Sequence, residues 1–484
     1  MTLDISRRYA AATAGRPDRP GLVVAVLGFC GVVVALMQTL IVPLVPILPQ
    51  ILGTSAANAS WAVTATLLAG AVVTPIAGRL GDMYGKRLIL VASLVSLTAG
   101  SLVCAVSSTL APVVAGRVLQ GAAMGAIALG ISIMRDELPP DRVGSAIAIM
   151  SATMGIGGAV GIPVAATIAE KADWHALFWA SAGLGVTALV AVLLVVPESP
   201  VTTPARFDHL GALGMAVGLL ALLLPITKGG DWGWTSPATI GSLAGSVVVF
   251  GVWGRYQLRR SAPLVDLRVS ARPQVLFTNL ASISVGFAMF GMSLVPTQIL
   301  MAPAEGGHGP GLSMIGAGLV LAPSGLVMFA FSPISAAISA RYGARTTLAV
   351  GAAVLGSGYL VLLAMRTHVW QILLATMIIG AGIGLAFAAM PALVMGAVPV
   401  SETAAANGLN SLMRAVGTSS SAAVIGVVLA HLTVDLGDRT IPSSTGFTVA
   451  ISLTIAAAAV TMLFTLFIPR HPPRPDRTPT SSGE

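Results

Sequence analysis

Long, unbroken runs of apolar residues alternate with short polar segments along almost the whole chain. No charged side chain occurs between Pro20 and Gly78. That stretch has room for two membrane crossings, because about 20 apolar residues span the hydrocarbon core. The runs are continuous and do not alternate in polarity, which favours helices over a β-barrel. We expect fourteen transmembrane helices, near residues 22–49, 60–79, 88–106, 110–134, 143–168, 176–196, 210–227, 238–257, 274–300, 311–335, 346–365, 370–397, 409–431 and 447–468.

The composition supports a polytopic membrane protein. Of the 484 residues, 55% are hydrophobic and only 9% are charged, whereas soluble domains carry about 25% charged residues. So few charges cannot cover a water-exposed surface, which excludes a soluble enzyme or a disordered scaffold. No phosphate-binding Gly-rich loop occurs, and the acids, His and Cys form no candidate active site. We therefore expect neither an enzyme nor a bound cofactor or metal.

Basic residues divide unequally between the two sets of loops. With an even number of spans both termini share one side, and that side holds 20 of the 26 Lys and Arg residues. Cytoplasmic loops carry such an excess, so the pattern predicts cytoplasmic termini. Orientation in the membrane thus explains the net charge of +8, and no nucleic-acid partner is expected. The opposite side holds Lys171, Lys228, Arg366 and Arg439, and Arg117 and Arg414 fall within spans.

The polar segment between spans 2 and 3 carries a tight cluster of glycines and charges. Residues 78–87 read Gly-Arg-Leu-Gly-Asp-Met-Tyr-Gly-Lys-Arg. Asp82 is expected just before a helix N-terminus, whose dipole favours an anion. Lys86 and Arg87 can meet lipid phosphates or acidic partners. With this spacing, between two spans, the segment resembles the signature loop of the major facilitator superfamily.

Further segments resemble the 14-span drug:proton antiporter family of that superfamily. Residues 110–125, with Arg117 and Gln120, are similar to its arginine-containing fourth-span motif. Residues 157–163 are similar to its antiporter motif, although Pro163 stands one place late after Gly161. Trp61 with the residues that follow it, Trp174 with Phe178, and the segments 230–234 and 263–268 also look like this family.

The resemblance implies an all-α major facilitator fold with two six-helix bundles and two additional helices. The corresponding division is a cytoplasmic N-terminal segment (1–21), an N-terminal bundle (22–196), two linker helices with their loops (197–272), a C-terminal bundle (273–468) and a disordered cytoplasmic tail (469–484). Residues 336–345 look like a decayed copy of the signature loop, with Ala340 at the place of Asp82. The family further implies a monomer in the plasma membrane that rocks around a midplane site.

The first span departs from the family pattern. Met37 stands where the family carries a cavity-facing Asp, although Thr39 matches. All 18 acids fall in tails, loops or span ends of the predicted topology, whereas proton coupling commonly uses a buried carboxylate. Three explanations stay open. In the first, a span-end acid such as Asp82, Asp136 or Asp208 lines a wet cavity and couples transport. In the second, transport is uncoupled or an exchange of solutes. In the third, span boundaries are misplaced near Glu305 or Asp231.

Arg117 is the side chain most clearly marked for function, because a charge inside a span costs at least ~2.5 kcal/mol. It is expected to face the cavity, to relay conformation or to meet an anionic group, and the alternative is a packing charge satisfied by backbone carbonyls. Arg414 is placed nearer the cytoplasmic end and could snorkel. The expected substrate-binding residues are Gln38, Trp61, Arg117, Gln120, Met124, Asn279, Gln298 and Asn410. The expected gating and coupling residues are Gly78, Asp82, Gly85, Lys86, Arg87, Arg117, Gly161 and Pro163.

The sequence therefore predicts a secondary active transporter. It is expected to export small amphipathic organic compounds, such as drugs or antibiotics, by alternating access. Proton exchange is what the family implies, and protons and membrane lipids are the expected partners beside the substrate. The alternative is an uncoupled or exchanging transporter of an anionic or neutral metabolite with Arg117 as its anion contact.

Overall fold

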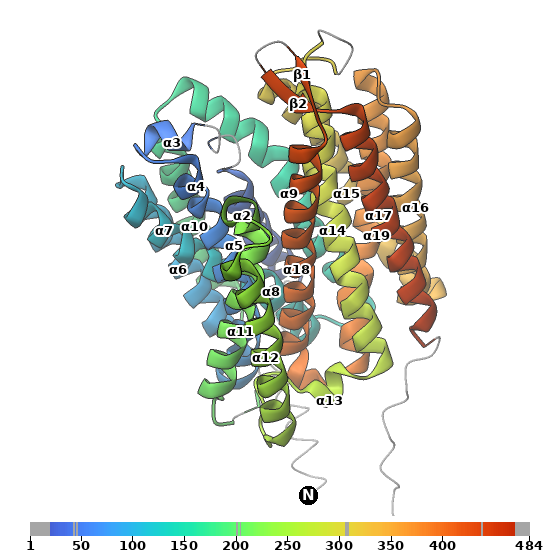
Figure 1. Cartoon of the computed structure of the whole chain (residues 1–484). Helices are drawn as coiled ribbons and strands as arrows, with labels where there is room; N and C mark the ends of the chain where they lie inside the picture. The colour runs from blue at the N-terminus through green and yellow to red at the C-terminus, as the bar shows by residue number, and fades with distance from the viewer. Residues whose placement is uncertain are drawn as a thin grey trace, which may run out of the picture.

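Fourteen helices of the described chain are long and apolar enough to cross a membrane (Figure 1). The computed structural model describes residues 20–41, 44, 47–199, 202–203, 205–304, 309–436 and 439–469. The spans are α2 (Pro20–Thr39), α5 (Trp61–Tyr84), α6 (Lys86–Ala105), α7 (Leu110–Ala122) continued through η2 (Ala123–Gly125) by α8 (Ala126–Glu137), α9 (Pro140–Lys171), α10 (His175–Val195), α11 (His209–Trp232), α12 (Pro237–Arg259), α14 (Pro273–Met301), α15 (Met314–Tyr342), α16 (Ala344–Ala364), α17 (Val369–Ala397), α18 (Thr403–His431) and α19 (Ser444–Phe467).

Short elements join some of the spans. They are α3 (Leu48–Ile51), α4 (Ala56–Ala59), α13 (Leu267–Ser270), η4 (Val400–Glu402) and the hairpin of β1 (Thr433–Leu436) and β2 (Arg439–Pro442), in which Val434 pairs with Ile441. The predicted number of spans is confirmed. The first span ends ten residues earlier than expected, because α2 ends at Thr39 instead of continuing to residue 49. The expected disordered tail, from residue 470 on, lies outside the described residues.

The turn after α5 is shorter than the sequence suggested. Asp82 lies in the last turn of α5, and Gly85 alone separates α5 from α6. Gly85 has φ +115°, a backbone conformation that other residues rarely adopt. The expected loop is therefore a one-residue turn, and it holds the charged side chains on rigid helices.

Two apolar cores organise the helices into two halves. One core joins helices α2 to α10, around residues such as Leu27, Leu94 and Leu129. The other joins α14 to α19, around residues such as Leu355 and Ile383. The spans thus form two six-helix bundles, here the N half and the C half, as expected. The extra helices α11 and α12 lie between them in sequence (Figure 1).

Helix α11 packs beside both halves. A third apolar cluster contains Leu68 of α5, Leu219 of α11 and Leu412 of α18. Helix α12 is fastened to α11 by the Trp253 indole, which donates to the Gly211 carbonyl at 2.7 Å. Only 11% of the α12 span is buried inside the protein. Helix α11 therefore lies along the line where α5 and α18 meet, and α12 lies outside it.

Small residues bring the two halves into close contact along two seams. In the seam of α9 and α15, Gly155 and Gly325 face one another so closely that a Cβ on either would meet the other's carbonyl. In the seam of α5 and α18, a Cβ on Gly408 would lie 3.0 Å from the Thr74 carbonyl oxygen. Small residues allow such backbone approach in lipid, where packing drives association.

We name the two ends of the molecule by the chain. The proximal end is where α2 begins and α19 ends, at the bottom of Figure 1, and the distal end carries the β1–β2 hairpin. In the seam of α5 and α18, the close contacts join residues 74–82 to residues 404–408, which is the proximal part of both helices. Residues 395 and 404 of the C half also belong to the core of the N half. The halves are thus sealed together toward the proximal end.

Candidate functional site

The proximal seal is centred on Asp82, whose side chain is fully buried. Its Oδ1 accepts a hydrogen bond from the backbone N–H of Ala404 at 3.2 Å, and its Oδ2 accepts one from Ala405 at 2.8 Å. The first N–H groups of a helix lack partners inside the helix, and the dipole there favours an anion. Asp82 in the N half thus caps α18 in the C half. We expected Asp82 to lie at a helix N-terminus, and it does. The helix is α18 of the other half, however, and not α6, which follows Asp82 in sequence.

Lys86 is buried beneath Asp82 and does not reach the lipid. Its Nζ lies 3.7 Å from Asp82 Oδ1 and forms a closer ion pair with Asp136 of α8. The expected contact of Lys86 with lipid phosphates is therefore wrong, because the side chain is 0% exposed. Arg87 also turns to the protein, since its Nη2 donates to the Leu193 carbonyl at 2.7 Å.

The segment after α10 adds hydrogen bonds to the proximal seal. Thr203 donates its backbone N–H to the Asp82 carbonyl at 2.7 Å, and its hydroxyl donates to the Ser401 carbonyl at 3.2 Å. Thr203 therefore bonds both halves at once. A cavity of about 200 Å³ beside it is lined by Arg79, Asp266 and Glu402 among others.

Two glycines of the signature segment have separate structural reasons. A Cβ on Gly78 would collide with the carbonyl of Ala404, so α5 can approach α18 only with glycine there. Gly85 has the positive φ of the turn, and a Cβ there would meet the Glu198 carboxylate. The same carboxylate accepts the backbone N–H of Arg87 at 3.1 Å. The seal therefore depends on glycine at two points, one for close approach and one for backbone conformation.

Arg117 is buried inside the N half, with 2% of its surface exposed. Its Nε donates to the Ala62 carbonyl at 2.9 Å, and its Nη1 donates to the Met37 carbonyl at 3.2 Å and to Gln120 Oε1 at 2.6 Å. Gln120 donates in turn to the Ser101 hydroxyl at 2.8 Å. Arg117 thus meets the backbone of the residue that replaces the family's acid, and no carboxylate of the described chain lies within 4 Å of it.

Other expected substrate-binding residues of the N half are dispersed. The Met124 side chain packs against Gly70 of α5 and fills the space that a Cβ at residue 70 would occupy. Trp61 faces α11, where the Lys228 ammonium lies 5.2 Å from its ring centroid. Gln38 is half-buried in the last turn of α2. The structure does not bring these side chains to the guanidinium of Arg117.

The antiporter-like segment of α9 packs against α2. A Cβ on Gly161 would collide with the Thr39 hydroxyl, and that hydroxyl donates to the Gly157 carbonyl at 3.0 Å. Pro163 lies inside α9 and removes one backbone donor there. The segment therefore fixes how closely the first and fifth spans approach.

The C half contains a polar cluster that joins three spans. Asn410 of α18 donates to Asn279 Oδ1 at 2.9 Å and to the Ser282 hydroxyl at 2.7 Å, both on α14. Arg414 donates through Nη1 to Asn410 Oδ1 at 2.7 Å, and its guanidinium carbon lies 5.0 Å from the centroid of the Phe387 ring on α17. Gln298 is exposed farther along α14 and lies outside this cluster.

Two features of this arrangement were missed or misjudged from the sequence. Arg414 does not snorkel to the proximal end, because its side chain is 8% exposed and bonded within the C half. The four-residue spacing of Asn410 and Arg414 on an apolar helix was the available signal. Lys228 is also buried in the structure, where it lies beside Asp231 and Trp61.

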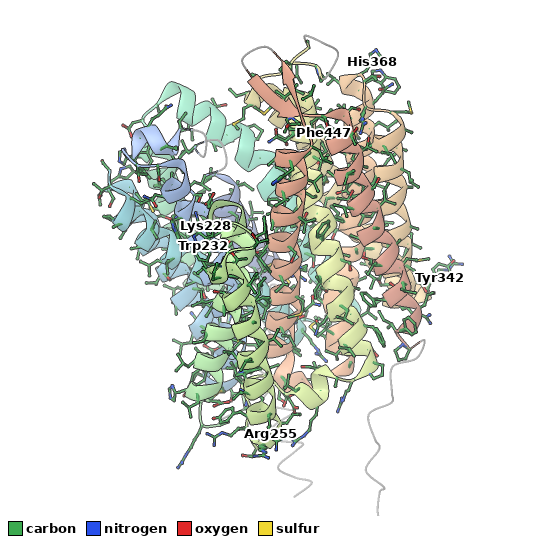
Figure 2. The ribbon with its side chains drawn as sticks, in the orientation of Figure 1. Lys228, Trp232, Arg255, Tyr342, His368 and Phe447 are labelled. Carbon is green, nitrogen blue, oxygen red and sulfur yellow. The ribbon has the colours of Figure 1, made fainter. Side chains whose placement is uncertain are left out.

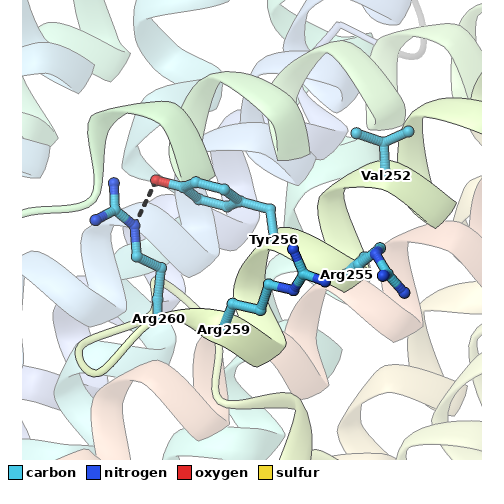
Figure 3. Close-up of a pocket in the computed structure, with 5 residues that line it drawn as sticks. All are labelled: Val252, Arg255, Tyr256, Arg259 and Arg260. Atoms are coloured by element: carbon cyan, nitrogen blue, oxygen red, sulfur yellow. Dashed lines mark hydrogen bonds between the residues drawn. The ribbon is translucent and has the colours of Figure 1, made fainter.

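A separate hollow of about 410 Å³ lies at the proximal end of α12, lined by Val252, Arg255, Tyr256, Arg259 and Arg260 (Figure 3). Figure 2 shows Arg255 at that end, well below Lys228. The Arg260 Nε donates to the Tyr256 hydroxyl at 2.7 Å, and this bond raises the pKa of the guanidinium. Because α12 lies outside both bundles, we do not place the transport path there. No group of three or more His, Cys, Asp or Glu that could hold a metal occurs in the described ranges.

Comparison with known proteins places the sequence in a family. The sequence profile described as "Major Facilitator Superfamily" matches residues 27–305 and 281–483. An uncharacterized MFS-type transporter of Mycobacterium tuberculosis is 28% identical over 86% of this chain, which spans 60% of that relative's length. The tetracenomycin C resistance and export protein of Streptomyces glaucescens is 27% identical over 88% of this chain and 78% of its own.

A further relative and one solved structure agree with this placement. The multidrug resistance protein Stp of Mycobacterium tuberculosis is 28% identical over 76% of this chain and 68% of its own. The crystal structure of the human organic anion transporter MFSD10 superposes with a TM-score of 0.65, covering 93% of this chain and 99% of the human one. At 14% identity, that likeness concerns the fold alone.

Proposed function

The chain belongs to the Major Facilitator Superfamily, and from that premise we propose that this multi-pass membrane transporter exports small amphipathic organic compounds such as drugs or antibiotics. Relatives that share most of its length are named for antibiotic export and multidrug resistance. The proposed mechanism is alternating access, in which the N half and the C half rock about a site between them.

The observation that carries this proposal is the proximal seal. It consists of a few directional bonds, chiefly those from the first turn of α18 to Asp82, set between glycine-lined helix surfaces. Such directional bonds can break and re-form when the two halves move relative to one another. In alternating access, breaking this seal would expose the site between the halves to the proximal side.

Asp82 also supplies a route to proton exchange. Protonation of its carboxylate removes the charge that interacts with the α18 dipole, which weakens the seal. The same carboxylate lies 3.7 Å from the Lys86 ammonium, which also pairs with Asp136. Protonation of Asp82 therefore leaves Asp136 as the one charged partner of Lys86 among the ion pairs of the described residues. Exchange of substrate for protons requires that the proton enters from the distal side, and protonated Asp82 would then favour opening at the proximal end.

We place the proximal end in the cytoplasm and the protein, as a monomer, in the plasma membrane. The excess of Lys and Arg in the proximal loops and termini supports that orientation. Domain limits follow the expected division, with 22–196 and 273–468 as the two bundles and 197–272 as the linker. Export then requires substrate uptake from the proximal side, or from the lipid, and release at the distal end.

An alternative is an uncoupled or exchanging transporter of an anionic or neutral metabolite. The observation in its favour is the buried charge of Arg117, which has no carboxylate within 4 Å in the described part of the chain. Three of its N–H groups already have acceptors, however. An anion at Arg117 would compete with the bonds that fix the guanidinium.

The experiment is transport by the purified full-length chain in phospholipid vesicles, with and without an imposed pH gradient. Export driven by the gradient, abolished by a protonophore, supports proton antiport. Transport of a drug-like dye that ignores the gradient removes proton coupling and favours the alternative. Absence of transport for every amphipathic probe, from protein that is monodisperse and folded, contradicts the proposed function.

A further inference from the structure

One face of α18 points toward the meeting of the two halves. Asn407, Ser411, Arg414 and Thr418 follow one another at helical spacings of four and three residues, so they share that face. At one end of it Asn407 donates to the Ser132 hydroxyl of α8, in the N half, at 3.4 Å. The neighbouring faces are occupied, one by α5 at Gly408 and the other by α14 through Asn410 and Gly417.

Arg414 lies near the middle of the membrane-spanning length on this face. It stands eleven residues after the start of α18 at Thr403, which at 1.5 Å per residue is about 16 Å. It lies about 10 Å farther from the proximal end than Asn407. The bond of Asn407 to the N half belongs to the proximal seal, so Arg414 lies on the distal side of that seal. Transporters of this architecture hold substrate near the midplane.

The guanidinium of Arg414 is held in position before any ligand arrives. Nη1 donates to Asn410 and Nη2 donates to the Ser411 hydroxyl at 2.8 Å. Its carbon lies over the Phe387 ring, an arrangement that attracts a cation to the face of an aromatic ring. Asn410 is itself fixed by two residues of α14. Such support keeps a charged group oriented at low entropic cost.

The charge of Arg414 has no ionic partner. Its side chain is 8% exposed, and none of the ion pairs of the described residues includes it. A guanidinium carries five N–H bonds, and the two acceptors above engage two of them. A buried charge is costly unless it is paired. Arg117 differs, because two backbone carbonyls and Gln120 surround it within a single bundle.

We propose that Arg414, with Asn410 and Phe387, forms a subsite for the anionic group of an amphipathic organic substrate. A carboxylate or sulfonate would take the free N–H bonds of the guanidinium in charge-assisted hydrogen bonds, and the Phe387 ring offers an apolar surface to the rest of the molecule. The inference rests on the proposed transport function and names its substrate class. It also transfers the anion contact from Arg117 in the N half to Arg414 in the C half.

The test uses two dyes with one ring system and opposite charge, carboxyfluorescein and rhodamine 6G. The full-length chain is reconstituted in phospholipid vesicles and the flux of each dye is measured for wild type, Arg414→Gln, Arg414→Lys and Ser411→Asp. Arg255→Gln, which removes the same charge from the proximal end of α12, is the matched control. Chromatography and thermal unfolding check that each variant is folded.

We expect wild type to move carboxyfluorescein. Arg414→Gln should reduce that flux at least tenfold, Arg414→Lys should retain part of it, and Arg255→Gln should leave it unchanged. Ser411→Asp keeps the guanidinium and places a carboxylate beside it, so it should also reduce the anionic flux at least tenfold while sparing or raising the cationic flux. If Arg414→Gln does not fold, Ser411→Asp decides the question.

Three results would overturn the inference. One is full carboxyfluorescein flux in folded Arg414→Gln, and another is full flux of that dye in Ser411→Asp. The third is a wild type that moves rhodamine 6G but not carboxyfluorescein, which leaves the proposed export function standing. Transport of neither dye by folded wild type would overturn the export function as well, so the two failures are distinguishable.

Discussion

Neutralising Asp82 tests the seal directly. In Asp82→Asn the amide oxygen can still accept one of the two N–H groups of α18, those of Ala404 and Ala405, while the amide nitrogen faces the other as a second donor. A hydrogen bond to a charged group contributes about 1.5–3 kcal/mol and a neutral one about 1 kcal/mol. The interaction with the helix dipole adds up to ~2 kcal/mol.

A neutral amide costs less to bury than a carboxylate, and this offsets part of the loss. We therefore expect the closed proximal seal to be destabilised by about 2–4 kcal/mol. Since 1.4 kcal/mol corresponds to a factor of ten, the balance between closed and open seal shifts by roughly 30- to 700-fold. Lys86 keeps its ion pair with Asp136, so the N half itself should stay folded. The effect is therefore on conformation more than on stability.

The assay is a distance measurement across the seal. Spin labels on Tyr84→Cys and Val400→Cys report it, because these residues are 57% and 46% exposed at the proximal end and belong to opposite halves. The native Cys30 and Cys104 are fully buried and do not compete for the label. Asp82→Asn should move the distribution to longer distances. Asp173→Asn, a neutralisation at the distal end, should not, and an unchanged distribution in Asp82→Asn would refute the reasoning.

Other predictions concern packing and buried charge. Gly161→Ala should lower the free energy of unfolding by about 1–3 kcal/mol through its collision with Thr39, as followed by thermal unfolding. Gly158→Ala, where nothing lies within 4 Å of the new Cβ, should cause no loss and should stabilise slightly, because alanine is the better helix former; equal losses would contradict the packing argument. Arg117→Met leaves carbonyls unpaired and should cost about 2 kcal/mol in the same measurement, whereas an unchanged midpoint would assign the residue no structural role. Met37→Asp supplies the missing acid beside Arg117 and should steepen the response of dye flux to an imposed pH gradient; an unchanged response would contradict a coupling role for an acid at this position.

Much of the fold could be predicted because its cause is local. Each span needs about 20 apolar residues, so the runs alone gave fourteen helices, as the structure has them. The end of the first span was missed because residues 40–52 stay apolar after α2 has ended. Hydropathy does not distinguish such a segment from a continuing span.

The site was less predictable because its bonds join distant parts of the chain. Residue types in the signature segment indicated an anion at a helix N-terminus, but the partner of Asp82 lies more than 300 residues away. Burial of Lys86 between two acids likewise depends on how α5 and α8 pack. For Arg414, the position within its span was misjudged because α18 begins at Thr403 and not near residue 409. Six more residues place the guanidinium well inside the membrane.

The two kinds of contact made by α11 determine which half it accompanies. Toward α18 it presents apolar side chains such as Leu219, which packs in one cluster with Leu412, and apolar surfaces can slide without losing directional bonds. Toward the N half, Lys228 bonds the Ser60 hydroxyl and lies against Trp61. When the angle between the halves changes, α11 should therefore move with the N half as one rigid body, together with α12, which is bonded to α11. The relative motion then takes place at the apolar interface between α11 and α18.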